Sequence, residues 1–143
     1  MLTETLYMGP SSSINQELMP WEPLFSKDYH IIQNACKTLT PSEFKTQQEP
    51  MYKLWMHRVD SLEQSKTLQP EAMQMLKNDV MINYGAWLLE FILMRDMDAR
   101  KDTTNTILKI KETPDYYDFL KAMPLNDVLS LIHISEPTRP RLI

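Results

Sequence analysis

Two polar residues interrupt the apolar segment near the middle of the chain, and with a third beside it they are the first candidates for chemistry. Asn83 and Glu90 are seven positions apart, so in a helix they share one face about two turns apart, and Asp79 lies near the same line. Such a seam of amide and carboxylate oxygens suits a metal ion or a polar ligand. A buried carboxylate without a partner is costly, so Glu90 must be paired, protonated or at an exposed edge. We favour the simpler interpretation, an exposed or partner-facing stripe on an otherwise buried helix.

The histidines and the single cysteine do not form a catalytic pattern. His30 and His57 lack the Glu-x-x-His spacing of a di-metal bundle, and the sequence contains neither HExxH nor GxSxG. We expect both histidines to be surface or packing residues. Because Cys36 is the only cysteine, the chain can form neither an internal disulfide nor a multi-thiolate zinc site. We expect Cys36 to be a small buried hydrophobic residue. The sequence therefore predicts no catalytic residue, no cofactor and no metal site.

The last fifteen residues, LSLIHISEPTRPRLI, add His133 and the motif Pro137-x-x-Pro140, which suits a ligand that docks in an aromatic groove. The motif is short, and its prolines exclude a helix or a central strand. The stretch LSLIHISEPTRP, residues 129–140, closely resembles the translation of a transposase-inserted sequencing adapter. In the reading frame of that adapter, a variable index sequence would complete the codon of Pro140 and encode Arg141 and Leu142. The constant segment that follows begins with a codon for isoleucine, the final residue.

This resemblance implies that residues 129–143 are a non-native, adapter-derived tail, which is excluded from reasoning about the fold. His133 then has no claim to catalysis or metal binding. The resemblance also implies that the natural chain continues beyond Val128. We therefore expect residues 26–128 to be a helical domain that is truncated, and so incomplete, at its C-terminus.

The composition bounds the class of protein. The chain has 143 residues, 43% of them hydrophobic, which is enough to build a core and argues against global disorder. A formal charge of -4 without a basic stripe argues against nucleic acid as the main partner. Glu4 stands where a secretory signal would be basic, and with the single cysteine this favours a cytoplasmic location. Gly9 and Gly85 are the only glycines, which disfavours an all-β fold, a dinucleotide-binding fingerprint and a P-loop.

Residues 1–25 are predicted to form an N-terminal arm that lies extended against the helices. Gly9, Pro10 and the serines that follow break regular structure. Leu18, Trp21 and their apolar neighbours are too many for a solvated tail. We favour packing against the arm's own domain over binding to a partner.

Ser26 is predicted to cap a helix that reaches about Leu39. Its apolar positions recur at helical spacing and include Ile32, Ala35 and Cys36. Tyr29 belongs to the same stripe, so this helix should pack along one face.

A second start signal follows directly. Thr40 can cap a helix, Pro41 suits its first position, and Glu43 can complete a capping box. This helix is predicted to end or kink at Pro50, because proline lacks the N–H that the helix needs. A further helix over residues 51–65 is predicted from apolar residues on one face: Tyr52, Trp55, Val59 and Leu62.

The strongest predicted element is one long helix over residues 70–101, which Pro70 and Glu71 suit as a start. Its centre, Val80 to Met94, is apolar nearly all round, which is typical of a helix buried in a core or a membrane. This segment has 15 residues and contains polar interruptions, whereas a membrane span needs about 20. We therefore favour a central buried helix over a membrane segment.

The chain after this helix is less clearly patterned. Arg95 and the charged residues up to Asp102 are predicted to form a solvated end. Residues 106–112 suit either a short helix or a strand. Thr113 and the proline after it can begin another helix, which must stop before Pro124.

Methionine and tryptophan are the remaining compositional features. The 11 methionines all precede the tail, and several lie on the long helix, where they can fill core gaps or line an adaptable binding surface. Trp21, Trp55 and Trp87 are candidate interface anchors. We favour core packing for both residue types.

These observations predict an all-α, irregular helical bundle built around one long central helix. The favoured function is a non-enzymatic structural or protein-interaction module, with a protein partner or a second copy on an apolar helix surface. One alternative is the N-terminal helical domain of a larger enzyme whose active site lies beyond residue 128. Another is a membrane-associated helical protein, which the short apolar segment disfavours.

Overall fold

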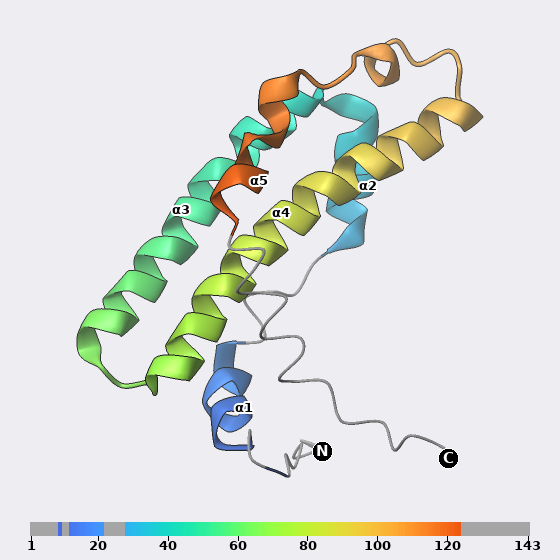
Figure 1. Cartoon of the computed structure of the whole chain (residues 1–143). Coiled ribbons are helices and arrows are strands. Elements are labelled where there is room, and N and C mark those ends of the chain that lie inside the picture. The colour runs from blue at the N-terminus through green and yellow to red at the C-terminus, as the bar shows by residue number, and fades with distance from the viewer. Residues whose placement is uncertain (1–8, 10–11, 22–27, 124–143) are drawn as a thin grey trace, which may run out of the picture.

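The computed structural model describes residues 9, 12–21 and 28–123, and within these ranges it contains helices and no strand (Figure 1). The described helical elements are α1 (Ser12–Leu18), α2 (Tyr29–Thr38), α3 (Pro41–Ser65), α4 (Pro70–Lys101), η2 (Ile107–Lys109), η3 (Pro114–Asp118) and α5 (Phe119–Ala122). The prediction of an all-α bundle around one long helix over residues 70–101 is confirmed. The tail with His133, and Ser26 as a cap, lie outside the described residues.

The long helix α4 is the axis of the fold. It begins with Pro70 and an acidic residue in its first turn and ends with Arg100 and Lys101, an arrangement that suits the helix macrodipole. Figure 1 shows α3 running antiparallel beside α4, α2 along its C-terminal half and α1 near its N-terminal end. Across the described residues, no helix combines the length and apolar character needed to cross a membrane.

The core forms two clusters along α4. The first core cluster joins α2, the start of α3, the C-terminal half of α4 and η3. Its buried residues are Ile32, Ala35, Cys36, Phe44, Leu88, Phe91, Ile92 and Tyr116. At its centre the rings of Phe44 and Phe91 stack with centroids 3.8 Å apart. The second core cluster joins α3 to the N-terminal half of α4 through Val59, Met73, Leu76 and Val80.

The capping signals decide where α2 and α3 begin. The Thr40 side chain accepts a hydrogen bond from the Glu43 N–H, and the Glu43 carboxylate accepts one from the Thr40 N–H, so the predicted capping box is confirmed. For α2 the cap is Asp28, whose carboxylate accepts from the His30 N–H at 2.9 Å. The first helical residue of α2 is therefore Tyr29.

Pro50 lies inside α3, and the prediction of two separate helices is wrong. A proline inside a helix removes one hydrogen bond and costs about 3 kcal/mol or more. The helix continues because both of its halves are anchored on α4, one through Phe44 and the other through Val59. Pro50 itself is exposed, so its ring meets solvent and not the core.

The predicted extended arm is also corrected. Residues 12–18 form the helix α1, and Ser12 donates its N–H to the Gly9 carbonyl at 3.1 Å as the helix begins. Leu18 and Trp21 pack against the second core cluster. The apolar residues of this segment therefore do pack on their own domain, but from a helix and the turn after it.

Gly85 allows the last described helix to approach α4 closely. A Cβ atom at this position would lie 2.8 Å from the Met123 sulfur and 3.2 Å from the Phe119 ring.

Residues 107–109 form a 3-10 turn, which resolves the ambiguity between helix and strand, and Thr113 precedes η3 and α5 as predicted.

Candidate functional site

The residues of the polar seam lie along α4 and are partly buried. Asn83 is half-buried and donates its side-chain N–H to the Asp79 carbonyl at 2.8 Å, one turn back in the same helix. Burial raises the pKa of the Asp79 carboxyl above its usual range. Glu90 is also half-buried. In the described part of the chain, no three histidine, cysteine, aspartate or glutamate side chains lie close enough together to hold an ion.

The histidines and Cys36 lie where the sequence predicted. His30 and His57 are exposed, on α2 and α3 respectively. Cys36 is fully buried, and its thiol donates a hydrogen bond to the Phe91 carbonyl at 3.5 Å. Burial is the main cause that raises the pKa of this thiol to about 11, so it stays protonated and unreactive at neutral pH.

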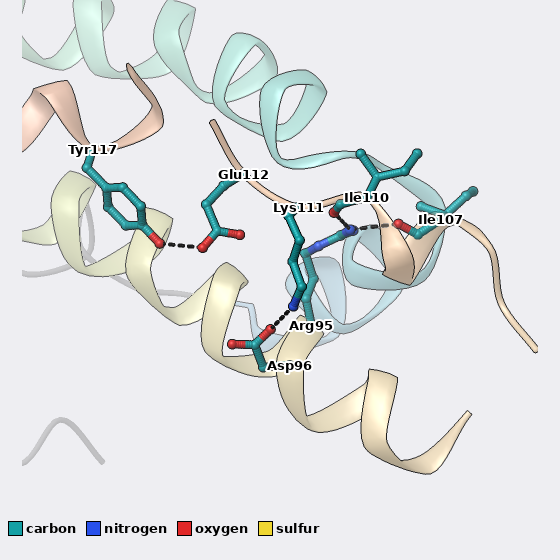
Figure 2. A network of polar contacts seen from close by, with 7 residues as sticks. All are labelled: Arg95, Asp96, Ile107, Ile110, Lys111, Glu112 and Tyr117. Carbon is teal, nitrogen blue, oxygen red and sulfur yellow. Dashed lines mark hydrogen bonds and ion pairs between the residues drawn. The ribbon is translucent and has the colours of Figure 1, made fainter. Parts of the chain in front are cut away.

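Arg95 is the clearest departure from the sequence prediction, because it is 3% exposed and not part of a solvated end. Its guanidinium donates to four main-chain carbonyls. Two belong to Cys36 and Leu39 at the end of α2. The other two belong to Ile107 and Ile110 around η2 (Figure 2). The cation also lies 5.5 Å from the Phe91 ring centroid.

Further polar contacts order the same segment and join it to α4. Lys111 pairs with Asp96 at 3.2 Å, and the Tyr117 hydroxyl donates to the Glu112 carboxylate at 2.7 Å (Figure 2). The buried Tyr116 hydroxyl donates to a main-chain carbonyl of α4 at 2.7 Å. Because the four carbonyl partners of Arg95 belong to the chain itself, we assign this network to the fold and not to a ligand.

One cavity that can accept a ligand lies between α2, α3 and α4. It has a volume of ≈ 330 Å³, at the lower end of the roughly 300–1,000 Å³ typical of ligand pockets. Four aromatic side chains line it, two from each of the long helices: Tyr52, Trp55, Tyr84 and Trp87. Ile31 of α2 and Met51 of α3 also line it, and each is about half exposed. We call this site the aromatic groove.

The aromatic groove lies where the two core clusters meet. Tyr84 and Trp87 pack against the first core cluster, and Tyr52 and Trp55 pack against the second. The rings of Tyr52 and Tyr84 stack across the junction with centroids 4.2 Å apart. Burial raises the pKa of Tyr52 and is the main cause that raises the pKa of Tyr84 to about 12, so both phenols are neutral at pH 7.

Most of the polar side chains that line the aromatic groove are uncharged. Asp28, the N-cap of α2, is the one ionised side chain among the described residues that line the aromatic groove. The others are amides, Gln47, Gln48 and Asn83. Asn83 already uses a donor within α4, so it can offer its carbonyl oxygen to a ligand. The lining therefore presents aromatic surface, hydrogen-bond acceptors and one negative charge.

The structure brings together residues that were separate candidates in the sequence. Asn83 was a candidate in the polar seam, and Trp55 and Trp87 were candidate interface anchors; all three line the aromatic groove. Tyr84 and Ile31 were missed as site residues, because Tyr84 looked like core and Ile31 was not singled out. Comparison with protein-family models, curated proteins and solved structures finds no match to this chain.

Proposed function

We propose that this chain is a non-enzymatic helical module that binds a segment of a partner protein in the aromatic groove. The observation that carries the proposal is the lining itself: four aromatic rings, two half-exposed apolar side chains and a polar margin. Tyrosine and tryptophan are the residues that most often dominate the energy of protein interfaces. A cytoplasmic location is part of the same proposal.

The position of the other reactive groups supports a binding role. The two described histidines are exposed on different helices, and the Cys36 thiol is buried. None of these three side chains lines the aromatic groove as described. The groove can therefore contribute shape, aromatic contact and hydrogen bonds to a partner without a nucleophile beside a base.

The test is a peptide-display selection on the purified chain. We expect enriched peptides that bind the chain and lose at least about tenfold in affinity with Ile31→Glu, because a carboxylate then faces apolar ligand surface. Ile31 is 58% exposed, so this change should leave the fold intact. Leu93→Glu is the matched control, since Leu93 is 61% exposed and lies outside the groove lining. Enriched peptides that bind both variants equally well would overturn the proposal.

A further inference from the structure

The lining of the aromatic groove favours a cation. The face of an aromatic ring carries negative electrostatic potential, and tryptophan is the strongest partner for a cation. Trp55 and Trp87 line the groove from α3 and α4, beside the neutral rings of Tyr52 and Tyr84, which stack on each other. Asp28 adds a full negative charge, and no described lysine or arginine lines the cavity to oppose it.

The same lining discriminates between kinds of cation. A primary ammonium is a compact and strongly hydrated charge, so a lysine would lose more hydration than one carboxylate and a few amide oxygens replace. An arginine fork needs planar, bidentate acceptors, and the single carboxylate Asp28 already accepts from the His30 N–H. A methylated ammonium has a larger apolar surface and suits aromatic rings.

The geometry points to a methylated lysine side chain of the partner protein as the group that enters the aromatic groove. The inference rests on the proposed function and specifies the ligand of that same site. In the complex the methylated ammonium lies against the aromatic rings, Asp28 supplies the compensating charge, and Ile31 and Met51 contact the neighbouring apolar residues of the partner. No covalent step is involved, so the module recognises the modification and does not make it.

The first test separates charge from shape with two small probes. Choline and 3,3-dimethylbutanol have the same outline, but only choline carries a positive charge. We expect choline to bind roughly fivefold or more tightly, the size typical of cation–π contacts. Binding is followed by calorimetry and by tryptophan fluorescence. Equal affinity for the two probes, or no binding of choline, would overturn the inference; equal binding would leave the proposed function standing.

The second test uses a variant that keeps the helix cap. Asparagine caps helices about as well as aspartate, so Asp28→Asn should remove the charge without unfolding α2. We expect it to weaken choline binding about threefold or more and to leave 3,3-dimethylbutanol unchanged. Asp60→Asn, an exposed position on α3 outside the groove lining, is the control with the same net charge. An equal loss in both variants would show that general charge, and not the groove, attracts the probe.

The third test identifies the source of the cation. A short peptide with a central trimethyllysine, the same peptide with unmodified lysine, and vesicles of phosphatidylcholine are compared as ligands. We expect binding of the trimethylated peptide, at least about fivefold weaker binding of the unmodified one, and no retention on vesicles. Retention on vesicles with no preference for the methylated peptide would contradict a protein partner.

Discussion

The rings of Tyr52 in α3 and Tyr84 in α4 stack with centroids 4.2 Å apart and planes 15° apart. This contact crosses the junction between the two core clusters, so it fixes the two long helices relative to each other at that level. The aromatic groove lies beside the stack, with one tryptophan from each helix in its lining. A site built on the facing sides of two long helices is held more rigidly than one built on loops.

Replacement of Arg95 by alanine should destabilise the protein by about 3 kcal/mol or more, because the change leaves main-chain carbonyls of Leu39, Ile107 and Ile110 without their donor. The free energy of unfolding is measured by urea denaturation. Arg100→Ala, at an exposed position one helix turn or so later, should change it by less than about 0.5 kcal/mol. Similar stability of the two variants would contradict the assigned role of Arg95.

Replacement of Pro50 by alanine should stabilise the protein by about 1–3 kcal/mol, because alanine restores the missing helical hydrogen bond and removes the steric conflict in α3. Pro50 is exposed, so no core contact is lost. Thermal and urea unfolding measure the effect, with Lys53→Ala as an exposed control in the same helix. A destabilised Pro50→Ala protein would show that the proline is required by the local geometry.

Substitutions at Gly85 should separate helix propensity from close packing. Alanine improves the propensity of α4 by about 1 kcal/mol but brings a Cβ atom against Met123 and Phe119. The flexible methionine can move, so we expect Gly85→Ala to change the unfolding free energy by less than about 1 kcal/mol. Gly85→Leu should cost more than about 2 kcal/mol and weaken hydrogen-exchange protection in α5. Equal stability of the two variants would show that the approach is not tight.

The capping box at Thr40 should make stability depend on pH. The Thr40 N–H and hydroxyl hold the pKa of the Glu43 carboxyl below its ordinary 4.5, so the folded chain binds this proton less readily than the unfolded chain. The contribution of the Glu43 carboxylate to stability is complete at pH values above its ordinary pKa. It is lost as the pH falls through the lower pKa that this carboxyl has in the folded chain. The difference in stability between the original protein and Glu43→Gln should therefore shrink on acidification. A difference that stays constant between pH 7 and pH 3 would contradict this.

The fold class and the central helix follow from local signals in the sequence. Apolar spacing and the Pro70 start define α4, and the capping box at Thr40 marks the beginning of α3. Pro50 misled the prediction because the penalty of an interior proline is local, whereas the packing that offsets it comes from α4. The extended arm was wrong for a related reason, since the helix α1 is short and depends on its contact with the core.

The site was less predictable than the fold. Arg95 follows an apolar segment and precedes several charged residues, so its position in the sequence suggests a solvated side chain. Its burial depends on carbonyls of α2 and η2, which no local pattern places beside it. The aromatic groove likewise combines Ile31, Trp55 and Trp87 from three helices. The two tryptophans were predicted to be core residues and Ile31 was not singled out, and only the packing of α2 on α4 makes them one surface.

The most direct test of the groove as the binding site is a two-dimensional NMR titration of the isotope-labelled chain with a peptide enriched by display. We predict that the largest shift changes fall on the indole N–H signals of Trp55 and Trp87 and on the side-chain amides of Gln47 and Gln48. Small shifts there, with the largest changes on α4 around the exposed residues Leu89, Leu93 and Met97, would contradict the account.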